Sequence, residues 1–172
     1  MAGARKCAAN SLRAGNRAGR IISMQSSSLR SPYEKIAGLV YVGRMLDKIR
    51  LHRAQQLLAD YVPNLGIGLD RQACLFLAID YPALVERVGQ GGTDEEIVEW
   101  CMARWHRPRE QDIAIWNEFM RKFGWYDKAA PRLRQRIAES KLEGRSDIFT
   151  LFDQIEVDEG RESKWEQRTS AA

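Results

Sequence analysis

Strong helix stop and start signals divide the sequence into short segments, and this division is what most constrains the fold. The clearest signal is the run GGTDEE at residues 91–96. Its glycines end one helix, while Thr93 and Glu96 form a capping box at the start of the next. Asp94 and Glu95 lie favourably in the first turn of the new helix dipole. Segments bounded in this way predict short helices joined by tight turns.

The same pattern recurs along the rest of the chain. Apolar residues in each segment are spaced three or four positions apart, as on one face of a helix. Cys74 and Cys101 lie inside such runs as small hydrophobes. We therefore expect an all-α fold, a single-domain orthogonal bundle of six or seven short helices. The expected helices start at or next to the following residues: Arg44, Asp70, Asp80, Thr93, Pro108, Pro131 and Ser146.

Residues 31–58 hold the densest mixture of apolar and charged positions. The sequence Ser-Pro-x-Glu at residues 31–34 has the spacing of a capped helix start. Gly38 and Gly43, however, each weaken a helix by about 1 kcal/mol relative to Ala. We expect a short first turn, a loosened segment between these glycines, and a firm helix over residues 44–58.

Charge separates the N-terminal residues from the rest of the chain. The formal net charge is +4, but residues 1–30 contain six of the 27 basic side chains and none of the 23 acidic ones. That leaves 21 basic and 23 acidic residues, a net charge of −2, in the other 142 positions. The high pI is therefore no indication of nucleic-acid binding.

Composition also predicts how the chain is organised. Residues 1–30 read as a disordered basic leader, residues 31–161 as one helical domain and residues 162–172 as a frayed tail. The leader superficially fits a mitochondrial transit peptide, but a start of translation at Met24 explains it more simply. The leader lacks the apolar core of a secretory signal. No run approaches the length of a membrane span, and the three cysteines form no Cys-x-x-Cys spacing. We expect a soluble cytoplasmic protein.

A locally basic cluster on the predicted 44–58 helix is the main candidate site, and it consists of Arg44, Asp47, Lys48, Arg50 and His52. Asp47 lies three residues from both Arg44 and Arg50, within reach of either. One interpretation is a solvated face whose exposed ion pairs contribute about 0–1 kcal/mol. The other is an anion site, in which Asp47 orients cations that bind phosphate or carboxylate. Spacing leaves both open.

Few residues elsewhere suit catalysis. Cys101 and His106 are too isolated to hold zinc without further ligands, and no serine lies in a Gly-x-Ser-x-Gly motif. Asp47 could form a carboxylate pair with Asp70 or Asp80 across a cleft. An ion-pair role for Asp47 and helix caps for the other two are simpler. We expect neither a metal nor a cofactor.

Several sequence blocks resemble a known family. They are LRSPYEK, GRMLDKIRLH, DYVPNLG, GLD, GGTDEE, Arg107-Pro108, the run from Trp116 to Lys122, and FDQIEVDEGR. Over residues 29–161 the chain resembles a bacterial family of domains of unknown function, the one numbered five thousand and sixty-nine. The resemblance implies a small soluble bacterial protein with no established activity, cofactor or partner. It also implies a break before Arg44, because relatives often have Pro where Gly43 stands, and it includes the Asp47-Lys48-x-Arg50 block.

We therefore expect a non-enzymatic binding or interaction module. Its cluster on residues 44–52 would engage an anionic small molecule or an acidic protein partner, but neither nucleic acid nor a membrane. The alternative is a small cytoplasmic enzyme acting on an anionic metabolite, with Asp47 or His52 as acid/base and Arg44 and Lys48 holding the substrate. An enzyme would present these charged groups in a concave pocket lined by Trp or Tyr, whereas a module would present them on an open surface.

Overall fold

The computed structural model describes residues 29–104 and 107–164, and this part of the chain is mostly helical. The finding confirms the predicted all-α helical bundle. A two-stranded antiparallel hairpin, β1 (Lys35–Ile36) and β2 (Leu39–Val40), precedes the helices. The helices are α1 (Val42–Arg53), the short 3-10 helix η1 (Ala59–Asn64), α2 (Leu69–Phe76), α3 (Tyr81–Gly89), α4 (Asp94–Ala103), α5 (Glu110–Lys122), α6 (Ala130–Glu139) and α7 (Leu151–Asp158).

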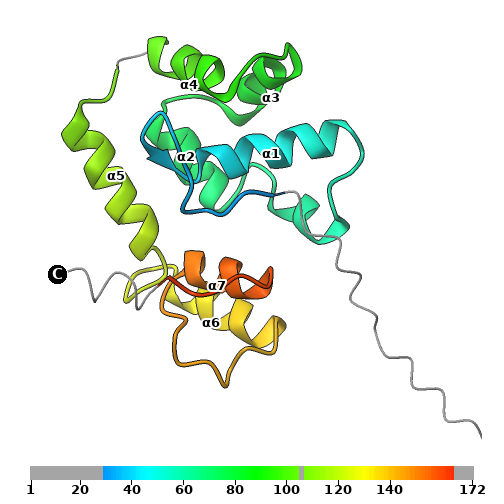
Figure 1. Cartoon of the computed structure of the whole chain (residues 1–172), viewed down its shortest axis with the longest axis vertical. Coiled ribbons are helices and arrows are strands. Elements are labelled where there is room, and N and C mark those ends of the chain that lie inside the picture. The colour runs from blue at the N-terminus through cyan, green and yellow to red at the C-terminus, as the bar shows by residue number, and fades with distance from the viewer. Residues whose placement is uncertain (1–28, 105–106, 165–172) are drawn as a thin grey trace, which may run out of the picture.

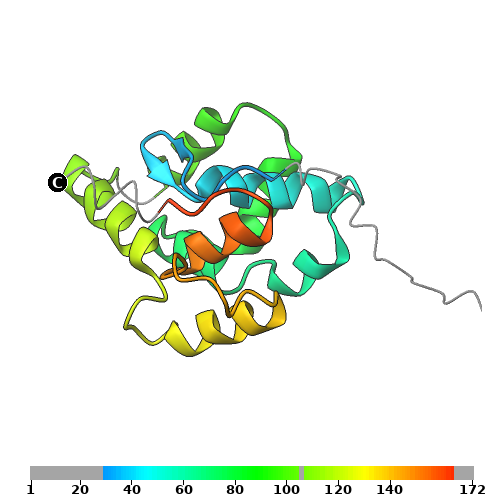
Figure 2. The same cartoon turned by 60° about the horizontal axis from the view of Figure 1, so that its bottom comes forward.

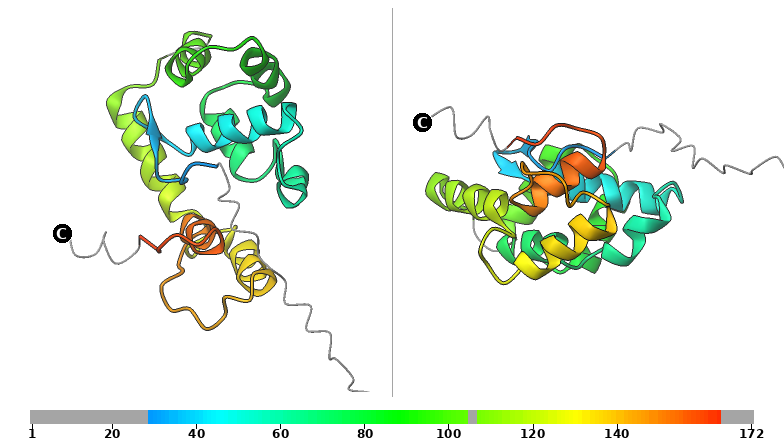
Figure 3. Two further views of the ribbon diagram at one scale, coloured as in Figure 1. Left: turned by 45° about the vertical axis from the view of Figure 1, so that its right-hand side comes forward. Right: turned by 90° about the horizontal axis from the view of Figure 1, so that it is seen from below.

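Helix α1 is central to the larger part of the fold (Figure 1). It packs against α3 and the hairpin, and α4 continues from α3 at the far end from α6 and α7 (Figures 1 and 2). Helices α6 and α7 pack on each other and form the other end of the molecule. Helix α5 runs along one edge and joins the two ends (Figure 3). As a result, α5 has one face on the core and another at the periphery.

Two groups of buried side chains hold these elements together. The larger group combines residues of β2, α1, α2, α3 and α4 with Trp116 and Met120 of α5 and Phe152 of α7. The smaller group joins the end of α5 to α6 and α7 through Phe123, Leu133, Ile148 and Leu151. Because α7 contributes to both groups, burial of its apolar face links the two ends of the fold.

The start of the domain differs from the predicted helix over residues 44–58. The expected break near Gly38 is a tight hairpin turn, and Gly38 has a φ of 83°. Asn117 of α5 fixes this hairpin, because its side chain accepts a hydrogen bond from the Val40 N–H at 3.0 Å and donates one to the Gly38 carbonyl at 2.8 Å. Helix α1 starts at Val42 and ends at Arg53, and Gln55 just beyond it has a φ of 57°.

The helix caps confirm some predictions and correct others. Thr93 and Glu96 form the predicted capping box at the start of α4. The predicted cap at Ser146 is wrong, since α7 starts four residues later with Thr150 as its cap and Asp153 as the reciprocal acceptor. The predicted cap at Asp70 is also wrong: this residue lies within α2, and its buried carboxylate contacts α1.

The predicted ends of the domain, after residue 30 and after residue 161, both lie within the part of the chain that the structure describes. Leu29 and Arg30 were assigned to the leader, but Leu29 is buried and Arg30 is bonded to α1. Beyond the predicted end of the domain at residue 161, Ser163 donates a hydrogen bond to the Asp147 carbonyl at 2.6 Å. The rest of the predicted leader, residues 1–28, and of the predicted tail, residues 165–172, lies outside the described residues. Among the helices that the structure describes, none has the length and apolar character to cross a membrane.

Candidate functional site

The five residues of the predicted anion site do not form one surface. Arg44 and Lys48 are buried, with 3 % and 4 % of their surface exposed. Asp47 and Arg50 are half-buried, and His52 is exposed in the last turn of α1. Since α1 lies in the core, successive polar positions of the helix point towards different neighbouring elements. The structure therefore distributes four of the five predicted residues over three groups of ion pairs, and His52 belongs to none of these groups.

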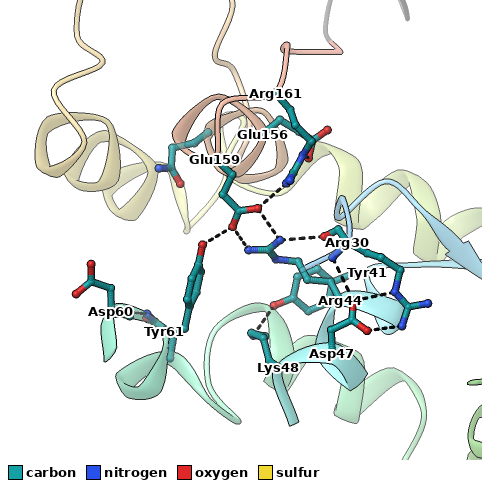
Figure 4. A network of polar contacts seen from close by, with 12 residues as sticks. Arg30, Tyr41, Arg44, Asp47, Lys48, Asp60, Tyr61, Glu156, Glu159 and Arg161 are labelled. Carbon is teal, nitrogen blue, oxygen red and sulfur yellow. Dashed lines mark hydrogen bonds and ion pairs between the residues drawn. The ribbon is translucent and has the colours of Figure 1, made fainter. Parts of the chain in front are cut away.

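Arg44 belongs to a group centred on Glu159, at the end of α7 (Figure 4). Its guanidinium pairs with both oxygens of the Glu159 carboxylate and donates to the Arg30 carbonyl at 2.9 Å. The Tyr61 hydroxyl and the Arg161 guanidinium donate to the same carboxylate at 2.5 and 2.6 Å. Burial raises the pKa of Glu159, but the hydrogen bonds from Arg44, Tyr61 and Arg161 outweigh it and hold that pKa below its ordinary value. The carboxylate is thus ionised and fully surrounded by donors of the chain itself.

Lys48 forms the second group, one turn further along α1. Its ammonium donates to the fully buried Asp70 at 2.5 Å and to the Tyr41 hydroxyl at 3.1 Å. Tyr41 donates to the same Asp70 oxygen at 2.8 Å, and the Gly66 N–H donates to the other oxygen at 3.0 Å. Burial lowers the pKa of Lys48 and outweighs the opposing effect of Asp70. This group ties α1 to the start of α2.

Asp47 and Arg50 belong to a third group, which includes the unpredicted Arg30. Arg30 donates two side-chain hydrogen bonds to Asp47, at 2.6 and 2.8 Å, and also pairs with Asp94 of α4. Arg50 donates to Asp94 at 2.6 Å. Asp47, which spacing along the helix puts within reach of Arg44 and Arg50, is instead bonded to Arg30, which reaches it from the segment before the hairpin. Asp94, interpreted from sequence as a helix-dipole residue alone, also joins two cations.

These groups have the geometry of a structural network. Each cation of the predicted site contacts a carboxylate of the same chain: Arg44 contacts Glu159, Lys48 contacts Asp70 and Arg50 contacts Asp94. A free anion would have to displace one of those carboxylates to bind there. Buried pairs of this kind hold elements in one arrangement, because separating them leaves an uncompensated charge.

The described residues give little support to nucleophilic or metal chemistry. Burial raises the pKa of the Cys74 thiol to about 12 and that of Cys101 to about 11, so neither forms a thiolate near neutral pH. Within residues 29–104 and 107–164, no three His, Cys, Asp or Glu side chains gather as a metal-binding group. Predicted His106 lies outside the described residues. Asp80 is exposed at the start of α3.

The outer face of α5 carries an apolar surface that sequence reasoning did not assign. Ile115 is 61 % exposed and Phe119 is 42 % exposed, and together they form a ridge with a groove on either side. On one side, a groove of about 760 Å³ extends to Leu75 and Phe76 of α2; on the other, one of about 660 Å³ extends to Trp125. Leu75 is itself 62 % exposed. Ile115, Phe119, Leu75 and Trp125 are called the α5 ridge surface below.

A signal for this surface was present in the sequence. Ile113, Trp116, Met120 and Phe123 already provide the core-facing stripe of the helix, so the apolar residues Ile115 and Phe119 lie outside that stripe. The sequence interpretation placed Phe119 on the flank of the core stripe and did not consider Ile115. In the structure, Phe119 contacts the rings of Trp116 and Phe123, at centroid distances of 6.1 and 5.2 Å. The ridge is therefore supported from below by the core.

Comparison with known protein families shows where this chain belongs. The family model described as "Domain of unknown function (DUF5069)" matches residues 26–161. No curated protein and no solved structure matches the chain. The matched segment contains both the ion-pair network and the α5 ridge surface, so the two lie within the family's domain.

Proposed function

The chain belongs to the DUF5069 family of domains of unknown function, and from the geometry of its described residues we propose that it is a non-enzymatic protein–protein interaction module. The α5 ridge surface is the contact site. The observation that carries this proposal is the exposure of two large apolar side chains, Ile115 and Phe119, between two grooves at the edge of the molecule. Exposed apolar patches rimmed by polar groups mark interaction sites in soluble domains.

The composition of the surface supports a protein partner. Its centre is aromatic and aliphatic, and exposed ion pairs lie at its rim: Arg109 with Asp112 at one end, and Lys122 with Glu118 at the other. This division into an apolar centre and a charged rim is typical of protein–protein contacts. The ridge residues Ile115 and Phe119 lie on a helix anchored by the buried Asn117, Trp116 and Met120, so the centre of the surface is held on a rigid element.

The ion-pair network favours this proposal over the two functions expected from the sequence. An anion-binding module needs cations available to a ligand, whereas Arg44 and Lys48 are buried against Glu159 and Asp70. An enzyme needs an acid or base facing a pocket, whereas Asp47 is bonded to Arg30 and His52 is exposed at the end of α1. The carboxylates that line the two grooves beside α5 are also bonded within the chain: Asp112 to Arg109, Glu118 to Lys122, and Asp127 to the N–H groups of Gly124 and Ala129.

The proposal is tested by site-specific photo-cross-linking of the full chain in its natural host. A photoreactive amino acid replaces Ile115 in one strain and exposed Arg134 of α6 in a matched control strain. We expect covalent adducts with protein from position 115 and none above background from position 134. Adding Phe119→Glu to the first chain should abolish the adducts, while adding Glu143→Lys, on an exposed loop, should not. Equal adducts from both positions would overturn the proposal.

The anion site is tested separately by thermal shift. A ligand at a hundred times its dissociation constant stabilises the folded state by about 2.7 kcal/mol. Phosphate, nucleotides and organic acids are screened against the wild-type chain and Arg50→Ala, because Arg50 is the most exposed cation of the network. We expect no shift in either protein. A shift that Arg50→Ala abolishes would favour an anion-binding function.

A further inference from the structure

The sequence of α5 is self-complementary when the helix is paired with an antiparallel copy of itself. Its outer stripe consists of Asp112, Ile115, Phe119 and Lys122, at intervals of three, four and three residues. Reversing the direction of the helix leaves these intervals unchanged. Two antiparallel copies aligned about Asn117 therefore place Ile115 opposite Phe119 of the second copy. They also place Asp112 opposite Lys122 of the second copy.

From this register we infer that the partner of the α5 ridge surface is a second copy of the same chain, bound by antiparallel pairing of the two α5 helices. The inference rests on the proposed function and names its partner. A two-fold axis requires the same patch on both subunits to complement itself. The α5 stripe meets that requirement in both shape and charge.

The shape complementarity comes from the ridge and the grooves beside it. Helices pack by inserting the side-chain ridge of one into the groove of the other. Ile115 and Phe119 line both grooves, of about 760 and about 660 Å³, so each copy offers a ridge and a place to receive one. Leu75 and Trp125 would then be covered at the sides. An isolated monomer leaves all four side chains partly in water.

The charge complementarity comes from the two ends of the stripe. Asp112 accepts hydrogen bonds from Arg109 at 2.9 and 3.0 Å, and Lys122 pairs with Glu118 at 3.1 Å. In the antiparallel dimer, Asp112 of each copy lies beside Lys122 of the other copy. Each exposed ion pair therefore gains a neighbour of opposite charge across the interface. Parallel pairing would place Lys122 beside Lys122 and Asp112 beside Asp112, and like charges in contact disfavour that arrangement. Charge thus selects the antiparallel register.

Sedimentation velocity of the purified full chain at increasing concentration tests the inference. We expect reversible association from monomer to dimer with a dissociation constant on the order of tens of micromolar. Phe119→Glu should weaken it at least about tenfold, because central aromatic residues dominate such contacts. Arg134→Glu, on the exposed face of α6, should leave it unchanged. Far-UV circular dichroism confirms that each variant is folded.

A charge exchange tests the register. Lys122→Glu places two carboxylates opposite each other and should weaken the dimer, and adding Asp112→Lys to the same chain should restore it. The inference is overturned if the wild-type chain remains monomeric at a few hundred micromolar, or if Phe119→Glu leaves its dimerisation unchanged. It is also overturned if the double variant Lys122→Glu with Asp112→Lys is folded but fails to associate. If the pure chain is monomeric but position 115 still cross-links to another protein, the second copy is rejected and the interaction module stands. If the pure chain does not dimerise and position 115 forms no cross-link, both the dimer and the interaction module are rejected.

Discussion

Charged side chains in the interior of this protein are bonded in specific pairs rather than collected at one site. Lys48 and Asp70 illustrate this, because the ammonium and the carboxylate are both buried and share the Tyr41 hydroxyl. Placing such charges in the interior costs free energy that only close partners offset. The polar residues of α1 therefore act by selecting which elements pack against it. Their removal should affect stability before it affects any binding.

Lys48→Met should destabilise the fold strongly. The substitution fills the volume of the side chain but leaves the Asp70 carboxylate buried without its cation. We expect the free energy of unfolding, measured in urea, to fall by about 3–5 kcal/mol. Adding Asp70→Asn should recover part of the loss, since the buried charge is then removed. The exposed pair of Arg145 and Asp147 is the control, and Arg145→Ala should change stability little. A loss as small as that of the control would contradict a buried pair.

Stability should also fall in acid, in a way that Glu159 partly controls. Its pKa in the folded state lies below the ordinary 4.5, and the pKa of Asp94 lies below the ordinary 3.8 because hydrogen bonds from Arg30 and Arg50 outweigh the effect of burial. The unfolded chain therefore binds protons more tightly than the folded chain. The stabilisation is complete above about pH 5 and is lost as the pH falls through the folded-state pKa values.

Glu159→Gln tests this assignment. The variant should be less stable than the wild type at neutral pH, because Arg44 loses its carboxylate partner. Its free energy of unfolding should nevertheless change less than that of the wild type between about pH 5 and pH 3, with only Asp94 and weaker groups contributing. Denaturant unfolding at several pH values measures how the free energy of unfolding changes with pH in each of the two proteins. The same pH dependence of unfolding free energy in Glu159→Gln and in the wild type would show that Glu159 is not the titrating group.

At the scale of elements, the β1–β2 hairpin is held by α5 rather than by its own strands. Two residues in each strand are too few to be stable alone. Asn117 supplies the missing partners, with its amide bonded to both the Val40 N–H and the Gly38 carbonyl. The hairpin also presents Leu39 and Val40 to the core, where both are fully buried. Helix α5 thus organises the hairpin on its inner face and offers the α5 ridge surface on its outer one.

Asn117→Ala should loosen the hairpin. The Val40 N–H would remain buried without an acceptor, a loss worth about 1–3 kcal/mol of unfolding free energy. Hydrogen exchange at the Val40 amide should accelerate by more than exchange at amides of α3, which the substitution does not touch. Gln111→Ala, at an exposed position of the same helix, should leave that exchange rate unchanged. Equal protection of Val40 in both variants would show that Asn117 does not hold the hairpin.

At the scale of the whole molecule, a residue outside the predicted domain joins distant elements. Arg30 connects the chain before the hairpin to Asp47 of α1 and Asp94 of α4. Leu29 beside it is buried. The folded body therefore includes residues that composition alone assigned to the leader.

Two truncated chains test how much Leu29 and Arg30 contribute to the stability of the fold. A chain beginning at Met24 should keep the stability of the full chain, whereas one beginning at Ser31 should lose at least the burial of Leu29, about 1.5–3 kcal/mol, together with the Arg30 pairs. Thermal unfolding of the two truncated chains against the full one measures the difference. Equal stability of the two truncated chains would mean that Leu29 and Arg30 contribute nothing to the fold.

A feature of this fold could be predicted from the sequence when the residues that determine it lie close together along the chain. The capping box of Thr93 and Glu96 and the helices around it were predicted because their determinants lie within a few residues of one another. The cap of the last helix was wrongly placed at Ser146, although Thr150 has the capping-box spacing to Asp153, whereas the residue three positions after Ser146 is Phe149. The helical fold itself follows from periodicity, which is also a local property.

The partners of the charged residues could not be predicted in the same way. Asp47 had candidates three residues away on either side, yet it binds Arg30, and Arg44 binds Glu159 at a separation of 115 residues. Which cation reaches which carboxylate depends on how the helices pack, and spacing along one helix carries no information about that. The sequence by itself determined the helical class, the capping box of Thr93 and Glu96, and the family. Only the tertiary structure decided that the basic residues of α1 are internal and that the apolar outer stripe of α5 is exposed, because burial is a property of the assembled fold.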